Sequence, residues 1–152
     1  MSQDTEAQEQ VSPVGPDEYN AVMEVWEASV RATHHYLREK DLQFYKPLVR
    51  HKYLKAVKLH AVRHPDGSIA GFMGTAKGAL EMLFIHPDSR GKGIGKLLLL
   101  HAIHKLKVSR VDVNEQNVQA IGFYERFGFR TADRSERDGT GKPYPILHMQ
   151  LT

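Results

Sequence analysis

Apolar side chains in the first third of the chain recur at the spacing of a helix. Between Pro16 and about Arg38 they return every three or four positions, which predicts an amphipathic helix. A second helical stretch is expected over residues 41–53, with an interruption near Pro47. Residues 1–14 are polar and lack any period, so we expect a flexible N-terminal tail there.

The hydrophobic period then changes to two, which is typical of strands. Residues 56–62 and 69–75 alternate in this way, and a Pro-Asp-Gly turn at 64–68 joins them into a hairpin. Residues 80–85 are almost continuously apolar, as expected for a strand in the middle of a sheet.

The second half of the chain alternates between helices and strands. The pattern predicts a helix over about 94–107, a strand over 109–113, a helix from Asn117 to Gly128, and strands over 129–134 and 145–151. No internal repeat is evident. This order of elements predicts one mixed α/β domain over residues 15–152.

The composition narrows the class of protein. The 152 residues are 41% hydrophobic and 26% charged, which is the profile of a single soluble globular domain. No apolar run approaches the ~20 residues that span a bilayer, and the first residues lack the features of a signal peptide. The absence of cysteine excludes disulfides, thiolate metal sites and a cysteine nucleophile. We therefore expect a cytoplasmic protein without a membrane partner.

Charge is unevenly distributed along the chain, although the net charge is only +3. Residues 1–20 carry five acids and no lysine or arginine, whereas residues 38–63 carry eight bases against two acids. The basic segment is either a solvated face or a surface that attracts an anionic partner. Nucleic-acid binding is kept as an alternative, although the sequence lacks any recognised nucleic-acid-binding module.

A glycine-rich turn follows the apolar strand and leads into a helix. It reads Arg90-Gly91-Lys92-Gly93-Ile94-Gly95-Lys96. Free backbone N–H groups and the helix dipole make such a turn an anion site, and glycine lets a phosphate group approach closely. The turn is not a P-loop, because Leu97 stands where a Ser or Thr is needed, and it lacks the dinucleotide-binding spacing. The alternative is a tight strand-to-helix turn with solubilising lysines.

Two motifs together resemble one enzyme family. The turn fits R-x-x-G-x-G, and Asn117 to Phe129 fits N-x-x-A-x-x-[FL]-Y-x-x-x-G-F. Both are similar to the GNAT family of acetyl-CoA-dependent N-acetyltransferases, and the resemblance covers about residue 16 to the end. The resemblance extends to one branch of the family, whose acceptor is uncharacterised. The segments that carry this closer resemblance are Ala32-Thr33-His34, Arg134-Ser135-Glu136 and Gly141-Lys142-Pro143-Tyr144-Pro145.

The resemblance implies a fold and a cofactor site. The fold is a central mixed, mostly antiparallel sheet flanked by helices, with acetyl-CoA in a cleft between splayed central strands and a bulge in the strand beside it. The backbone amides of residues 91–96 would hold the pyrophosphate, and those of Leu83 and Ile85 the pantetheine arm. The implied cofactor-binding residues are Leu83, Phe84, Ile85, Arg90, Gly91, Lys92, Gly93, Ile94, Gly95, Lys96, Asn114, Asn117 and Phe123. Asn117 is also a candidate helix cap, and Asn114 a candidate turn residue.

Tyr124 is the candidate general acid, because it matches the family's tyrosine. A phenol has a pKa near 10, so it keeps its proton at neutral pH and can protonate a leaving thiolate. The alternative is a core tyrosine, since Phe123 and Phe127 flank it on an amphipathic helix.

Two residues are candidates for the general base. Glu81 lies in an apolar strand, where an acid is costly unless it is partnered or used, and period two puts it on one face with Leu83 and Ile85. Its alternative is a structural salt bridge, and many relatives place the acid near position 79, which is Ala79 here. His34 is the second candidate, next to the acceptor pocket implied for the first helix.

That pocket is assigned to one side of the first helix, and the acceptor is expected to be a primary amine of a small molecule or of a peptidyl lysine. Without cysteine an acetyl-cysteine intermediate is impossible, and we expect the amine to attack directly in a ternary complex. The rival functions are a non-catalytic acetyl-CoA sensor and the nucleic-acid-binding module. We expect a monomer or homodimer and no metal, since no histidine pair forms a His-x-x-x-His motif with a carboxylate partner on a helix. The substrate-binding candidates are Trp26, Ser29, Val30 and Thr33.

Overall fold

The computed structural model describes residues 11–152. The helices are η1 (Pro16–Glu18), α2 (Tyr19–Thr33), α3 (Glu39–Leu48), the π-helical turn η2 (Val49–Tyr53), η3 (Leu54–Ala56), η4 (Pro87–Ser89), α4 (Ile94–His104) and α5 (Val118–Arg126). The strands are β1 (Val11–Pro13), β2 (Lys58–Arg63), β3 (Ile69–Ala76), β4 (Ala79–Ile85), β5 (Arg110–Asn114), β6 (Phe129–Ser135) and β7 (Ile146–Leu151). From Pro16 onward the predicted order of helices and strands is confirmed.

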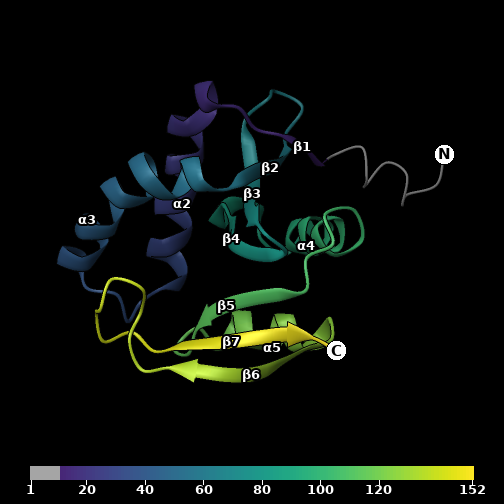
Figure 1. Ribbon diagram of the computed structural model, residues 1–152. Coiled ribbons are helices and arrows are strands. Elements are labelled where there is room, and N and C mark those ends of the chain that lie inside the picture. The colour runs from purple at the N-terminus through teal and green to yellow at the C-terminus, as the bar shows by residue number, and fades with distance from the viewer. Residues whose placement is uncertain (1–10) are drawn as a thin grey trace.

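The strands form one sheet in the order β1-β2-β3-β4-β5-β7-β6 (Figure 1). All neighbours are antiparallel except β4 and β5, which run parallel. This pair is joined only where Ala79 meets Arg110 and Leu80 meets Val111. The rest of β4 therefore has no strand partner on the β5 side, and the predicted splayed centre of the sheet is confirmed.

A β-bulge interrupts β4 just beyond this last pair. Gly74 of β3 lies opposite Met82, whereas Thr75 lies opposite Leu80, so Glu81 is the extra residue. Leu80 packs into the same apolar cluster as Leu83 and Ile85, so the bulge places two residues, Leu80 and Glu81, where regular alternation would place one. The expected shared face of Glu81 with Leu83 and Ile85 stays a prediction.

Two apolar clusters cover the two faces of the sheet. Helix α2 packs on one face, where Val22, Trp26 and Phe72 are buried. Helices α4 and α5 pack on the other, where Leu98 and Phe129 have no exposed side-chain surface. Figure 1 shows α2 and α3 on the left of the sheet, and α4 on the right. Each helix thus presents one apolar stripe to the sheet, as its sequence period predicts.

One expectation about the N-terminal third needs correction. Residues 1–10 of the predicted tail lie outside the described residues, but Val11–Pro13 form β1 and pair with His60–Val62 of β2. The interruption expected near Pro47 is confirmed, because α3 ends at Leu48 and the chain continues as the π-helical turn η2.

Candidate active site

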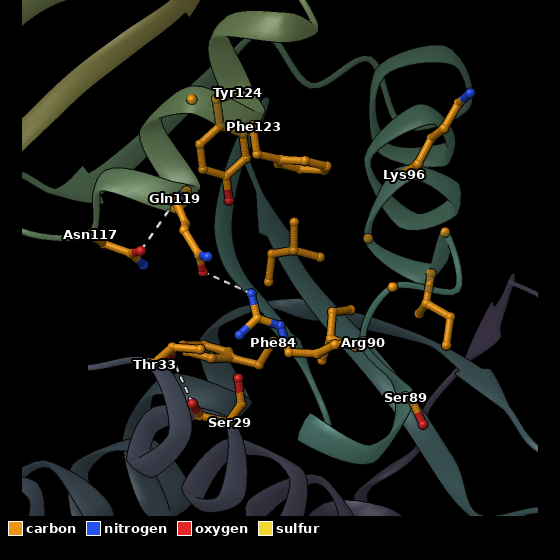
Figure 2. Close-up of a pocket in the computed structure, with 18 of the residues that line it drawn as sticks. Ser29, Thr33, Phe84, Ser89, Arg90, Lys96, Asn117, Gln119, Phe123 and Tyr124 are labelled. Atoms are coloured by element: carbon orange, nitrogen blue, oxygen red, sulfur yellow. Dashed lines mark hydrogen bonds between the residues drawn. The ribbon is translucent and has the colours of Figure 1, made fainter. Parts of the chain in front are cut away.

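The main cavity, of about 600 Å³, lies between the end of β4, the start of α4 and helix α5 (Figure 2). All of the predicted cofactor residues line it except Lys92 and Asn114. Lys92 is an exposed residue of the turn, so its side chain is in contact with solvent. Residues that the sequence interpretation missed also line this cavity: Ser89, Val118, Gln119, Ala120, Gly122 and Arg126.

The glycine-rich turn gives the cavity an anion site. Gly91 and Gly93 have φ angles of +77° and +79°, a region that glycine adopts without steric cost. A Cβ atom on either residue would meet no atom within 4 Å, so the space in front of the turn is open. The first helical bond of α4 runs from the Leu97 N–H to the Gly93 carbonyl at 3.0 Å, and the amides before it have no helical acceptor. Open space and free amides fit a pyrophosphate group.

Arg90 adds positive charge and crosses the cavity. Its guanidinium donates to the Gln119 amide oxygen at 2.9 Å and so connects η4 with α5 (Figure 2). Lys96 also borders the cavity, but its ammonium points away from the other labelled side chains. Of these two cations, Arg90 is therefore better placed to contact an anionic ligand directly.

The two predicted asparagines have different places. The Asn117 side chain accepts from the Ala120 N–H at 3.3 Å, caps α5 and lines the main cavity, so both of its predicted roles are compatible. Asn114 accepts from the Gln116 N–H at 2.8 Å and is absent from the main cavity. It ends β5 and lines two smaller cavities instead, because β5 diverges from β4 at this point.

Tyr124 combines a buried ring with a hydroxyl at the cavity. The residue is 6% exposed, and its ring packs edge-on against Phe123 and Phe129. Its hydroxyl points toward the centre of the main cavity (Figure 2). Burial raises the pKa of Tyr124 above that of a free phenol, so the group stays protonated at all physiological pH values. The core and cavity interpretations of Tyr124 are thus compatible.

Two smaller cavities, of about 210 and 110 Å³, adjoin the main one. His34 and Phe84 line all three, so the three spaces meet at these two side chains. The predicted substrate residues divide between them. Trp26 and Val30 line the second cavity, whereas Ser29 and Thr33 line the main cavity, because they lie further round α2 toward the end of β4.

The hydrogen bonds of His34 determine which ring nitrogen is free. The Thr33 hydroxyl donates its only proton to the Ser29 carbonyl at 2.8 Å, and it lies 2.7 Å from His34 Nδ1. The imidazole must therefore donate from Nδ1, which leaves Nε2 as an acceptor. Burial, with a smaller effect of His35, lowers the pKa of His34 to about 4. At neutral pH the ring is uncharged.

Glu81 lines the third cavity together with Asp112 and Tyr124. Burial and the negative charge of Asp112 raise the pKa of Glu81, while Arg110 acts in the opposite direction. No ion pair within residues 11–152 includes Glu81, so a structural salt bridge does not explain it. A carboxylate without a partner and with a raised pKa is suited to accept a proton.

Asp112 is held by a further histidine. The carboxylate lies 2.7 Å from His148 Nδ1, and His148 Nε2 lies 2.7 Å from the Ser135 hydroxyl. These three residues come from adjacent strands β5, β7 and β6. The sequence interpretation missed this network because the three residues are far apart along the chain and become neighbours only when the strands pair. The network fixes Asp112 beside the third cavity.

The buried histidine makes stability depend on pH. His34 has a pKa of about 4 in the fold and about 6.5 when unfolded, so the unfolded chain takes up its proton first as pH falls. We expect the free energy of unfolding to fall by about 2 kcal/mol between pH ~7 and pH ~5 through this residue, and by about 3 kcal/mol near pH ~4. Lowered pKa values at His60 and His101, caused first by burial, add a loss of the same sign.

Urea denaturation of the protein and of a His34→Gln variant at both pH values measures this effect. The variant should lose about 2 kcal/mol less over the same range, because glutamine does not titrate. Equal losses in the two proteins would show that His34 is not protonated on unfolding.

Two observations concern other kinds of site. Of the helices within residues 11–152, none has the length and apolar character needed to cross a bilayer. Across the same residues, no three His, Asp or Glu side chains gather as potential metal ligands. The chemistry that the described residues do support is anion binding next to a protonated phenol and an unpaired carboxylate.

Comparisons with known proteins identify the same family as the two motifs. The family described as acetyltransferase (GNAT) domain matches residues 22–152. The peptidyl-lysine N-acetyltransferase YjaB of Salmonella typhimurium is 40% identical over 133 residues, covering 88% of this chain and 91% of that protein. The solution structure of apo-form YjaB from Escherichia coli has a TM-score of 0.84 and 35% identity, and covers 93% of this chain and 96% of its own.

A more distant structure has the same fold. The PaiA N-acetyltransferase from Thermoplasma acidophilum, solved in complex with coenzyme A, has a TM-score of 0.71 at 20% identity and covers 93% of this chain and 98% of its own. The family match spans most of the chain, and the YjaB proteins are similar over nearly their whole length. The chain therefore belongs to the GNAT family of acetyl-CoA-dependent N-acetyltransferases, as its motifs predict.

Proposed function

We propose that this enzyme transfers the acetyl group of acetyl-CoA to the side-chain amine of lysine residues in proteins or peptides. The observation that carries the proposal is the meeting of three cavities at His34 and Phe84. One cavity fits the cofactor, a second gives an amine a separate route to the same point, and the third holds Glu81. The names of the YjaB relatives support lysine as the acceptor.

In this proposal the main chain positions the cofactor. The amides at the start of α4 bind the pyrophosphate, and Arg90 adds a positive charge. Beyond Leu80, the unpaired edge of β4 offers the backbone groups of Leu83 and Ile85 to an extended arm, as a neighbouring strand would. The bound cofactor supplies a thioester, and a β4 amide aimed at its carbonyl stabilises developing negative charge.

Two side chains move the protons. A lysine amine with a pKa of about 10.4 costs roughly 4.6 kcal/mol to deprotonate at pH 7, so a base is needed. Glu81 accepts this proton across the third cavity, directly or through water, and returns it to solvent because it is exposed. Tyr124 donates its hydroxyl proton to the leaving thiolate. Neutral His34 accepts a hydrogen bond at Nε2 and positions the amine.

The test is an acetylation assay with a peptide that contains a single internal lysine. We expect thiol release from acetyl-CoA and one acetyl group on the lysine by mass spectrometry. A matched peptide with norleucine in place of lysine should release no thiol above background. Thiol release that is equal with both peptides would contradict lysine as the acceptor.

A Glu81→Gln variant tests the base. We expect kcat/KM near pH 7 to fall by about a hundredfold, in the range typical of a lost general base, and the acidic limb of the pH profile to disappear. The control is Glu125→Gln, which removes an exposed carboxylate of α5 that lines no cavity. If Glu81→Gln behaves like this control, Glu81 is not the base.

The same proposal includes the finer expectations about setting. We propose that the enzyme works in the cytoplasm and acts as a monomer or homodimer. Size-exclusion chromatography with light scattering distinguishes the two oligomeric states.

A further inference from the structure

We propose that the second cavity is an aromatic sleeve for the aliphatic chain of the acceptor, and that Tyr36, Tyr45 and Asp138 select a slender, positively charged side chain. This inference rests on the proposed function and names the chemical class of its acceptor. The sequence interpretation missed these three residues. It placed the acceptor on α2 alone, whereas this cavity also uses α3 and the loop between β6 and β7.

The size of the cavity suits a side chain. Its volume of about 210 Å³ equals that of about seven waters in the liquid, and it is below the ~300 Å³ at which pockets for drug-sized ligands begin. A butylammonium chain fits such a space. The cavity reaches His34 and Phe84, which also line the main cavity. A chain inserted along it therefore ends where the thioester is expected.

The walls are suited to methylene groups and a cation. The aromatic rings that line the cavity come from Trp26, Tyr36, Tyr45, Phe84 and Tyr144. Such rings pack against methylene groups and attract an ammonium through their electron-rich faces.

One wall also carries negative charge. Asp138 lines the cavity and accepts hydrogen bonds from the Tyr45 hydroxyl and from the hydroxyl and N–H of Thr140. Burial acts to raise the pKa of Asp138, but these hydrogen bonds hold the pKa below its ordinary value. The Asp138 carboxylate therefore stays ionised. The nearby cation of Lys142 is paired with Asp41 at 3.1 Å and lies over the Phe44 ring, and it does not line the cavity.

The Tyr36 hydroxyl is the polar group that the fold leaves unsatisfied here. It is buried, and none of residues 11–152 forms a hydrogen bond with it. The Tyr36 ring lies against those of His34 and Tyr144, with centroids 5.4 and 6.2 Å apart. A buried hydroxyl without a partner is unfavourable, and a polar group of the acceptor satisfies it on binding.

Two reciprocal hydrogen bonds hold the sleeve in shape. Tyr45 of α3 donates to Asp138 of the loop, and Tyr144 of the loop donates back to Asp41 of α3 at 2.5 Å. The loop and the helix are thus joined at two points. Walls fixed before binding lose less entropy when an acceptor enters, and they also exclude branched chains.

The sole tryptophan gives a direct measure of occupancy. Trp26 lines this cavity and is the one tryptophan of the chain, so its fluorescence reports a ligand there. We would titrate the CoA-saturated enzyme with lysine capped at both ends as amides. A saturable change in emission is expected. Capped ornithine, which is one methylene shorter, should bind about fourfold more weakly, and uncharged capped norleucine at least about tenfold more weakly.

Variants separate recognition from folding. Tyr36→Phe should weaken binding of capped lysine by about fivefold and raise its KM similarly with little change in kcat. Asp138→Asn should weaken binding by about tenfold, and melting curves show whether its loop remains folded. The matched control is Tyr53→Phe, since Tyr53 lines none of the three cavities.

The outcomes distinguish this inference from the proposed function. If lysine peptides are acetylated but Trp26 emission and the KM of Tyr36→Phe are unchanged, the sleeve is wrong and the function stands. If capped lysine changes the emission but no lysine is acetylated, the binding site stands and the function fails. A response to n-butylamine but not to capped lysine would support the cationic sleeve and identify small amines as its source.

Discussion

Replacing Tyr124 by phenylalanine is expected to lower kcat by at least about a hundredfold, because the leaving thiolate loses its proton donor. The KM for acetyl-CoA should change by less than about twofold. The variant keeps the aromatic ring that packs against Phe123 and Phe129 and removes only a hydroxyl at the cavity. Steady-state kinetics near pH 7 measure both constants.

Two controls support the assignment of Tyr124. Thermal melting should show that the phenylalanine variant is folded, and calorimetry that it still binds coenzyme A. The burial that raises the pKa of Tyr124 also means that the activity of the wild-type enzyme should not fall through ionisation of this phenol up to pH ~10. An unchanged kcat in the variant would remove Tyr124 from the mechanism.

Replacing Gly93 by aspartate should abolish most cofactor binding. The φ angle of +79° is one that aspartate tolerates better than most residues, so the fold should persist. Its side chain would enter the open space in front of the turn, where the pyrophosphate is expected. Two like charges about 4 Å apart repel by ~4 kcal/mol near a protein surface, so we expect the dissociation constant of coenzyme A to rise by at least about a hundredfold.

The chain contains a matched control for this substitution. Gly78, in the turn between β3 and β4, also has a φ angle of +79° and no atom within 4 Å of an added Cβ. It lines none of the three cavities. Gly78→Asp should therefore cost similar stability by thermal melting and leave binding of coenzyme A unchanged. Equal affinities of the two variants by isothermal titration calorimetry would mean that the glycine-rich turn does not hold the pyrophosphate.

Local sequence signals predicted the elements and the cofactor turn, because their causes are local. The glycine spacing at 91–95 dictates an unusual backbone, and Asn117 caps the helix that carries Tyr124. The periods of three to four and of two identified nearly every helix and strand within two or three residues. These features depend on neighbours within a few positions of the chain.

The acceptor side of the site could not be predicted because it is built from distant contacts. Tyr144 and Asp41 are 103 positions apart, and Tyr45 and Asp138 are 93 apart. No local pattern distinguishes these tyrosines from ordinary core residues. The extra residue at Glu81 could not be predicted from the sequence for a related reason. A bulge is a property of two paired strands, and the sequence of one strand contains no sign of the extra residue.

The sparse pairing between β4 and β5 makes this enzyme sensitive to its own supply of cofactor. Only two residue pairs join β4 to β5, so the two halves of the sheet share few main-chain hydrogen bonds, although one apolar cluster packs against both halves. A ligand that contacts both halves adds about 2.7 kcal/mol to the free energy of unfolding when its concentration is one hundred times its dissociation constant. Without acetyl-CoA the protein would lose this support and unfold more easily, so its melting temperature should rise with the concentration of the cofactor.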